Sequence, residues 1–333
     1  MQIKEIGEEG IIKAIKSISQ AEASQVLIGI GDDAAVIRPE SGMVCLYACH
    51  MLVENSHFLL HKSTPFQIGY KGVSKSVADI EAMGGASRFL LVGLSMATDT
   101  SAQFIKELYD GIYAANAKGG ISVIGGDISD CQGPLTISLT IIGQGAEENL
   151  TPINAARAGD VLVVTGPLGS AAAGLHLLLN DISWEDSEAF REVMQKQLQP
   201  EPPWGKGQTL ARSAAVTAMT DISDSLTHNL QKICKASNKG ALLELKDLPI
   251  AKSAQMVADE LGCNVLDWVL NGGEDFELLA CVRPEQLSRV QELMKQNSYD
   301  IYTIGRIIEE PGLFIRSEGE TKTVSPQGFD HFR

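Results

Sequence analysis

The chain has 333 residues, of which 42 are acidic and 27 basic, giving a formal net charge of −15. Its length predicts two domains, and its apolar content of 44% excludes an intrinsically disordered chain. The acidic balance argues against broad nucleic-acid binding and against docking on an anionic membrane, because both depend on Lys and Arg. A small anionic ligand stays compatible, because a bound metal ion can invert the local charge.

Cysteine usage and the N-terminal sequence predict a cytoplasmic protein. The six cysteines are scattered without zinc-ligand spacing, so we expect free thiols in a reducing compartment. The polar N-terminus does not resemble a signal peptide. The uncharged segment 161–179 contains Pro167 and several glycines, so we expect a buried strand, a turn and a helix there and no membrane span.

In the first half of the chain, apolar spacing predicts alternating strands and helices. The expected helices cover residues 1–20, 66–83 and 101–118, and Gly84 and Gly85 are expected to end the second of them. The expected strands cover residues 26–30, 43–49, 89–96, 121–124 and 135–143.

A polar stretch at 145–159 separates the halves, so the predicted domains are 1–147 and 148–333. In the second half we expect strands at 161–165, 241–245 and 276–282, and helices at 170–180, 186–197, 206–214, 222–236, 251–261 and 264–270, before a last helix and strands. Strands and helices mixed in both halves predict two α/β or α+β domains.

Two loops have nearly the spacing of known phosphate-binding loops. Residues 29–34 resemble a dinucleotide fingerprint, but Asp32 and Asp33 stand where the phosphate would lie and would repel it. Residues 169–174 have Walker spacing, but Leu175 and His176 follow in place of Lys and Ser or Thr. Neither loop is expected to bind phosphate directly.

Carboxylates recur at expected strand ends, mostly beside glycine. They occur in Gly31-Asp32-Asp33, Gly125-Gly126-Asp127, Asp221-Ile222-Ser223-Asp224 and Gly272-Gly273-Glu274-Asp275, and Asp79 adds one within an apolar helix. Each Gly-Asp pair alone is also typical of a turn or helix cap, and Asp221 or Ser223 is suited to capping the next helix. Together the four indicate a site for Mg²⁺ and phosphate, because Mg²⁺ is held by carboxylates while it binds phosphate oxygens.

These segments resemble the thiamine-monophosphate kinase family of the aminoimidazole-ribonucleotide synthetase-like superfamily, in order along nearly the whole chain. ADIEAMGG (78–85), for example, is similar to that family's SDLAAMG helix. The other matching segments are IGIGDDAAVI (28–37), MLVENSHF (51–58), IGGDIS (124–129), ARAGDVLVVTGPLGSAAAGL (156–175), DISDSL (221–226), GGEDFELL (272–279) and GFDHF (328–332).

The resemblance implies an N-terminal mixed sheet that pairs with its copy in a homodimer, and a C-terminal α/β domain that covers the site. It implies ATP and several Mg²⁺ ions, with the γ-phosphoryl group passing to a small-molecule substrate. The implied metal ligands are Asp33, Asp79, Asp127, Asp221 and Asp224, of which Asp33, Asp127 and Asp224 are also expected to be catalytic. The implied ATP contacts are Tyr109, Gly126, Asp127 and Ser223, and the implied acceptor contacts are His57, Glu274 and Phe329. His50, at a position that departs from the family pattern, is a further candidate acceptor contact.

The chain also departs from the family pattern. His50 stands where the family carries a metal-binding carboxylate, an arginine expected near 149–153 is absent, and Ser225 replaces the glycine of DISDG. The best expectation is conversion of thiamine monophosphate to thiamine diphosphate. The alternatives are a paralogous kinase with another acceptor such as α-ribazole, another ATP-dependent activity of the superfamily, and a nucleotide-binding homologue with impaired catalysis.

Overall fold

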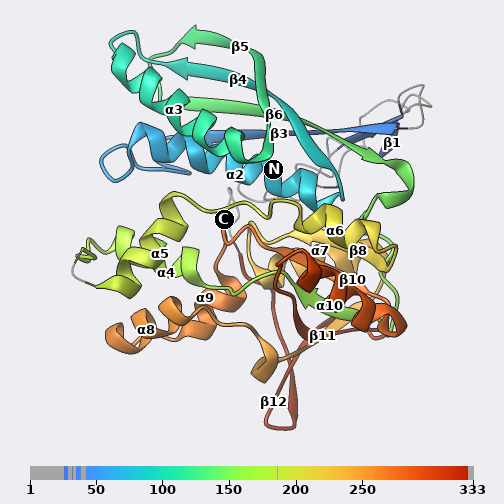
Figure 1. The fold of residues 1–333 in the computed structure, drawn as a ribbon. Helices are drawn as coiled ribbons and strands as arrows, with labels where there is room; N and C mark the ends of the chain where they lie inside the picture. The colour runs from blue at the N-terminus through green and yellow to red at the C-terminus, as the bar shows by residue number, and fades with distance from the viewer. Residues whose placement is uncertain (1–25, 29–31, 33–34, 39–42, 186, 329–333) are drawn as a thin grey trace, which may run out of the picture.

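A computed structural model describes residues 26–28, 32, 35–38, 43–185 and 187–328. The helix expected in residues 1–20, and the expected site residues Asp33 and Phe329, lie outside the described residues. Two mixed sheets, one from each half of the chain, lie at opposite sides of a central layer of helices (Figure 1).

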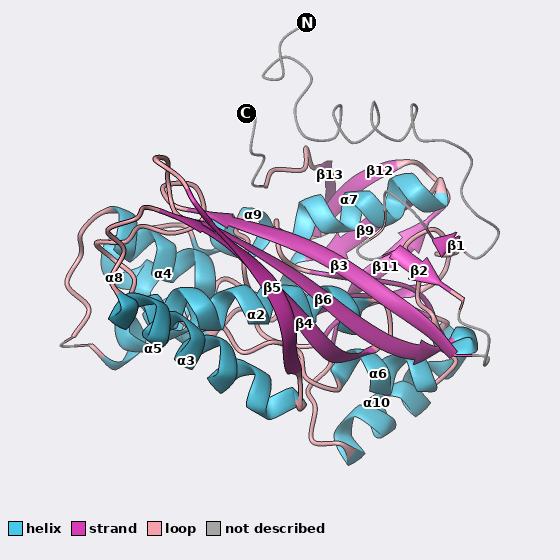
Figure 2. Cartoon of the chain, turned by 90° about the horizontal axis from the view of Figure 1, so that it is seen from above, coloured by secondary structure: helices cyan, strands magenta, loops and turns pink. Residues whose placement is uncertain are grey.

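The first sheet has six strands in the order β1-β2-β3-β6-β4-β5, and only the β4–β5 pairing is parallel. Helices α2 and α3 pack on one face, whereas no described element covers the other face (Figure 2). The elements are β1 (Val26–Ile28), β2 (Ala35–Ile37), β3 (Met43–Val53), α2 (Pro65–Ala82), β4 (Ala86–Met96), α3 (Ala102–Gly119), β5 (Ser122–Asp130), β6 (Thr136–Ala146) and η1 (Glu147–Asn149).

Helix α2 begins and ends where its sequence predicts. Thr64 caps it by a reciprocal pair of hydrogen bonds, in which Gln67 N donates to Thr64 Oγ1 at 3.3 Å and Thr64 N donates to Gln67 Oε1 at 2.9 Å. At the other end Gly84 adopts φ +77°, which glycine accepts without strain. The helix lies between the first sheet and the C-terminal half (Figure 1), so most of its surface is buried.

The second sheet has seven strands in the order β13-β12-β9-β11-β7-β10-β8, and only β9–β12 is parallel. Segment 161–179 forms strand β7 and helix α4, as expected, and no described helix is long and apolar enough to cross a membrane. The elements are β7 (Val161–Val164), α4 (Ser170–Leu179), α5 (Glu188–Leu198), α6 (Lys206–Arg212), β8 (Val216–Asp221), α7 (Leu226–Ser237), β9 (Gly240–Glu244), η2 (Leu245–Asp247), α8 (Lys252–Leu261), α9 (Val265–Asn271), β10 (Leu278–Val282), η3 (Pro284–Gln286), α10 (Leu287–Gln296), β11 (Tyr302–Ile308), β12 (Gly312–Ser317) and β13 (Glu320–Thr323).

The structure corrects three details of the predicted elements. Strand β3 continues to Val53, so His50 lies within a strand and not just after one. Strand β5 runs through Gly125-Gly126-Asp127 to Asp130, where a turn was expected, because Gly126 pairs with Val92 so closely that a Cβ atom would lie 1.8 Å from the Val92 carbonyl oxygen. Strands β2 and β8 were not predicted, because each is a short segment without a clear alternating pattern.

Candidate active site

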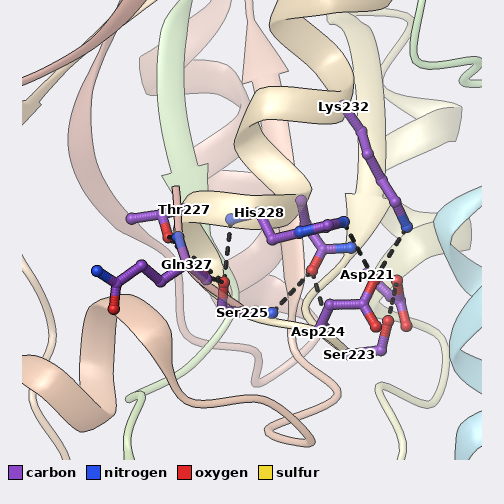
Figure 3. A network of polar contacts seen from close by, with 9 residues as sticks. Asp221, Ser223, Asp224, Ser225, Thr227, His228, Lys232 and Gln327 are labelled. Carbon is purple, nitrogen blue, oxygen red and sulfur yellow. Dashed lines mark hydrogen bonds and ion pairs between the residues drawn. The ribbon is translucent and has the colours of Figure 1, made fainter. Parts of the chain in front are cut away.

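The loop between β8 and α7 gathers polar groups around two aspartates (Figure 3). Strand β8 ends at Asp221, and Ser225 caps α7 by accepting a hydrogen bond from His228 N at 3.0 Å. The helix therefore begins at Leu226, later than predicted, and leaves residues 222–225 as a loop. Within that loop Ser223 Oγ donates to Asp221 Oδ1 at 3.1 Å.

Side chains of helix α7 bind this loop by hydrogen bonds and ion pairs. Asn229 Oδ1 accepts the backbone N–H groups of Asp224 and Ser225, both at 3.1 Å. Lys232 Nζ lies 3.1 Å from Asp224 Oδ2, and His228 Nε2 lies 3.9 Å from the same oxygen (Figure 3). Asp224 is thereby fixed in backbone and side chain, and its charge is balanced by Lys232 when no metal ion is bound.

The C-terminal segment is tied to the same loop. The carbonyl of Gln327 accepts hydrogen bonds from Ser225 Oγ at 2.5 Å and Thr227 Oγ1 at 3.0 Å. A Cβ atom on Gly328 would lie 3.2 Å from the carbonyl oxygen of Asp224. The chain is thus held beside Asp224 one residue before Phe329, the acceptor residue expected from the sequence.

Asp221 is a buried carboxylate with one unpaired oxygen. It is 1% exposed, and its Oδ2 atom is buried without a hydrogen-bond partner. Burial, followed by the charge of Asp79, raises the pKa of Asp221 to about 7. A buried, unpaired carboxylate oxygen beside a second carboxylate fits a cation with oxygen ligands such as Mg²⁺, which would remove both penalties.

His50 takes part in the same cluster. Its Nε2 atom lies 2.6 Å from Asp79 Oδ2, and both side chains are largely buried. The contact is close enough for an ion pair, but it is too bent for the ring N–H to form a hydrogen bond. Strand alternation puts His50 on the face that α2 covers, together with Ala48 and Leu52. The position that the family pattern gives to a carboxylate therefore faces Asp79 in this chain.

Glu274 is held by residues that sequence analysis did not identify. Its Oε2 accepts hydrogen bonds from Lys71 Nζ at 2.7 Å and Gln197 Nε2 at 2.9 Å. Burial alone would raise the pKa of Glu274, but Lys71 and Gln197 more than offset this, so the pKa lies below its usual range. Glu274 has φ +66°, and its N–H donates to the carbonyl of Ser223 at 2.8 Å. A strained loop thus docks directly on the aspartate loop.

His57 lines a cavity of about 320 Å³ at the junction of the two halves. Its Nδ1 accepts the N–H of Val53 at 3.1 Å, so a neutral ring carries its proton on Nε2. The cavity walls are mainly aliphatic, and Lys71 and Gln197 also line it. The structure therefore brings His57 and the partners of Glu274 to one cavity.

Three expected site residues lie apart from this cluster. Tyr109 is on α3, where its ring contacts Tyr113, and Gly126 and Asp127 lie on the edge strand β5. The strand register aligns His50 with Leu139, Val92 and Gly126, and it aligns Asp127 with Gly93, Ser138 and Met51. Alternation therefore puts Asp127 on the outer face of the sheet, about 14 Å across three strand spacings from β3.

The loop with Walker spacing is occupied by the protein itself. Asp275 Oδ2 accepts the N–H of Gly169 at 2.8 Å, and Oδ1 accepts that of Ala171 at 3.2 Å. Burial raises the pKa of Asp275 to about 7. The N–H groups at the start of α4 that would meet a phosphate are thus satisfied by a carboxylate.

The site is therefore assembled only in part. In the part of the chain that the structure describes, no three His, Cys, Asp or Glu side chains converge closely enough to hold a metal ion by themselves. Asp79, Asp221 and Asp224 carry carboxylate oxygens, the kind of ligand that Mg²⁺ prefers in proteins. Lys71 was missed by sequence analysis, although it is a charged residue within the same apolar helix that drew attention to Asp79.

Metal-free protein should become more stable when Asp221 is replaced by Asn. In the unfolded chain this carboxyl has a pKa of about 3.9, whereas in the folded protein the pKa is raised to about 7. The folded state therefore loses stability relative to the unfolded state as pH rises from about 4 to about 7. In EDTA at pH 8, we expect Asp221→Asn to raise the melting temperature by on the order of 3–5 °C, and to raise it much less at pH 5. Asp224→Asn, which breaks the pair with Lys232, should give no such gain. An equal gain at both pH values would contradict the assigned cause.

The comparisons with known proteins agree with this architecture. The model of the AIR synthase related protein N-terminal domain matches residues 31–144, and that of the C-terminal domain matches 157–318. These matches and the two mixed sheets define a two-domain protein of the AIR synthase related class.

Individual relatives identify one family within this class. Thiamine-monophosphate kinase of Mycobacterium tuberculosis is 35% identical over 284 residues, which cover 84% of this chain and 81% of the relative. The Bacillus subtilis protein of the same name is 31% identical over 313 residues, which cover 93% of this chain and 95% of the relative. The solved structure of AaThiL complexed with AMPPCP and TMP matches with a TM-score of 0.87 at 29% identity, covering 99% of both chains. The chain belongs to the thiamine-monophosphate kinase family, which confirms the family expected from its motifs.

Proposed function

We propose that this protein transfers the γ-phosphoryl group of ATP to thiamine monophosphate in a Mg²⁺-dependent reaction. The observation that carries the proposal is the junction of the two halves, where the charge of Asp79 acts on the buried Asp221 and the loop that carries Glu274 docks on the Asp221–Asp224 loop. The family relatives bear the name of this activity, and the related structure that holds AMPPCP and TMP matches the whole chain.

When bound, Mg²⁺ would neutralise phosphate charge on the transferred group. Asp79, Asp221 and Asp224 would hold the metal, and Ser223 orients Asp221 through its 3.1 Å hydrogen bond. Lys232 pairs with Asp224 when the metal is absent. Lys71 and Gln197, which line the His57 cavity, hold Glu274 by hydrogen bonds, and Glu274 would contact a polar group of the acceptor. Because the acceptor is an already ionised phosphate, the reaction does not require a general base.

The test is a coupled assay of ADP formation with several acceptors. Thiamine monophosphate, α-ribazole, other vitamin-like alcohols and monophosphates, and a no-acceptor control are compared at fixed Mg²⁺ and ATP. We expect ADP to form with thiamine monophosphate, and its formation to stop when EDTA is added. If ADP forms only with another acceptor, that compound is the substrate and thiamine monophosphate is not. If no acceptor increases ADP formation, the protein binds nucleotide without catalysing phosphoryl transfer.

We also propose that residues 1–147 form the dimerisation domain of a homodimer. The uncovered face of the first sheet carries Met51 and Phe89, which are 56% and 38% exposed, and soluble proteins usually cover such a face. Asp127 lies in the same row as Met51, so a second copy of the chain would cover it. Light scattering at micromolar concentration should give twice the mass of one chain for the wild type. Met51→Lys should shift the measured mass toward that of one chain. A monomeric wild type would contradict the proposal.

A different acceptor is the second candidate function, and the contact between His50 and Asp79 favours it. Imidazole is a poor ligand for Mg²⁺, so His50 removes one metal contact and leaves a group suited to accept a proton from an alcohol.

If His50 marks a changed acceptor, His50→Asp should raise kcat/KM for thiamine monophosphate relative to any other acceptor that the wild type uses, by about tenfold. His61→Asp, an exposed neighbour, is the matched control and should change neither rate. Rapid turnover of thiamine monophosphate by the wild type, with no effect of His50→Ala, would show that His50 is structural.

A further inference from the structure

Glu81 is a buried carboxylate that the proposed reaction does not use. It lies in α2, two residues after Asp79, and is 1% exposed. Its partners all belong to the start of α6 in the C-terminal half. Oε1 accepts Gly205 N at 2.9 Å and Gln208 Nε2 at 3.0 Å, and Oε2 accepts Gly207 N at 2.9 Å and Gln208 N at 3.2 Å. Both oxygens are thus fully used, across the junction of the two halves.

The backbones of α2 and α6 also meet at this point. A Cβ atom on Gly207 would lie 1.9 Å from the carbonyl oxygen of Glu81, so the approach depends on glycine. Ala82 of α2 belongs to one buried cluster with Leu210 of α6 and Met219 of β8. The contact is therefore fixed by packing as well as by hydrogen bonds, and it has little freedom to slide.

The path from this contact to the metal ligands is short. Helix α6 ends at Arg212, and strand β8 begins at Val216 and ends at Asp221. Glu81 thus holds the start of a helix and strand unit whose last residue is Asp221. Asp79 lies on the same helix as Glu81, and that helix packs directly against strand β8, which ends at Asp221. The position of α6 on α2 sets how Asp79 and Asp221 face each other.

We propose that Glu81 is a positioning residue that fixes α6 on α2 and thereby holds Asp79 and Asp221 in the arrangement needed to bind metal. This inference rests on the proposed function, because it concerns the same metal site. Glu81 itself does not touch metal or substrate: its oxygens are used by α6. Removing the Glu81 carboxylate would leave several N–H groups at the start of α6 without acceptors, which costs stability. Helix α6 could then shift on α2.

The experiment measures Mn²⁺ affinity in the presence of ATP, by calorimetry or by electron paramagnetic resonance, on those variants that are folded at the assay temperature. Glu81→Gln keeps the side-chain volume but turns one acceptor oxygen into a donor that faces N–H groups. We expect its dissociation constant for Mn²⁺ to rise at least tenfold. Gln208→Ala removes one of the four hydrogen bonds and should raise it about threefold, which keeps the proposal testable if Glu81→Gln does not fold.

Two controls separate positioning from general destabilisation. Ser74→Ala removes a hydrogen bond from α2 to the carbonyl of Pro200 in the same junction, and Ile307→Ala opens the C-terminal core in β11. Both should lower the melting temperature and leave Mn²⁺ affinity within twofold. Unchanged Mn²⁺ affinity in Glu81→Gln, or in Gln208→Ala if the first variant is unfolded, would overturn the inference. A wild type that binds no Mn²⁺ would instead overturn the proposed function.

Discussion

Replacing Asp79 by Asn should lower the rate of acceptor-dependent ADP formation at least about 100-fold. The substitution keeps the size of the side chain but removes a charge from the pair that Asp79 forms with Asp221 across the two halves. It also removes the carboxylate that His50 contacts at 2.6 Å. Because the metal ion is proposed to bind between these carboxylates, raising the Mg²⁺ concentration should recover part of the rate. A steady-state assay over a range of Mg²⁺ concentrations measures both effects.

The control for Asp79→Asn is Asp110→Asn. Asp110 is an exposed residue of α3 that pairs with Lys106 one helical turn away, and such surface pairs contribute little. Its replacement should leave the rate and the Mg²⁺ dependence unchanged. A wild-type rate in Asp79→Asn at limiting Mg²⁺ would show that this carboxylate does not bind the metal.

Gly273→Ala should lower kcat/KM about as much as Asp79→Asn lowers the rate, although Gly273 carries no side chain. A Cβ atom at this position would lie 2.4 Å from the carbonyl oxygen of Ser223 and 2.8 Å from that of Asp224. Both obstacles are backbone atoms, so the loop that carries Glu274 must move away from the aspartate loop. The hydrogen bond from Glu274 N to the Ser223 carbonyl, 2.8 Å long, would be lost. We expect a fall of about 100-fold in kcat/KM, measured together with the melting temperature.

Gly133→Ala is the matched control, because a Cβ atom on Gly133 would meet no atom within 4 Å. It should alter neither activity nor stability. If Gly273→Ala lowers the melting temperature but keeps wild-type kinetics, the contact between the two loops serves folding alone.

The aspartate loop was predictable because its chemistry is local. The segment Asp221-Ile222-Ser223-Asp224 places three oxygen-bearing side chains within four residues, and any fold that exposes this loop brings them together. Ser225 decides where α7 begins, and its capping role was obscured because Asp221 and Ser223 are equally good caps by sequence. Asp79, which lies more than 140 residues earlier, was conspicuous as a carboxylate within an apolar helix, and the family resemblance then assigned it to the same site.

The residues around that loop were not predictable in the same way. Lys71 and Gln197 meet Glu274 only because α2 and α5 come together at the junction of the halves, and no spacing in the sequence records this. The turn predicted at residues 125–127 is wrong for the opposite reason. Gly125-Gly126-Asp127 has the composition of a turn, but the close approach of Gly126 to Val92 requires glycine within a strand. Strand register, which composition does not reveal, then decides which face of the sheet carries Asp127.

If the proposed metal ligands Asp79 and Asp221 bind one ion, their division between the two halves links cation supply to the folding equilibrium. A Mg²⁺ ion held between Asp79 and Asp221 would act as a removable crosslink, and its binding energy would oppose separation of the halves. Without the ion, the same carboxylates repel each other at neutral pH and favour separation. The amount of folded protein in a cell would then follow the free Mg²⁺ concentration, so magnesium starvation would act on the lifetime of the chain as well as on its catalytic rate.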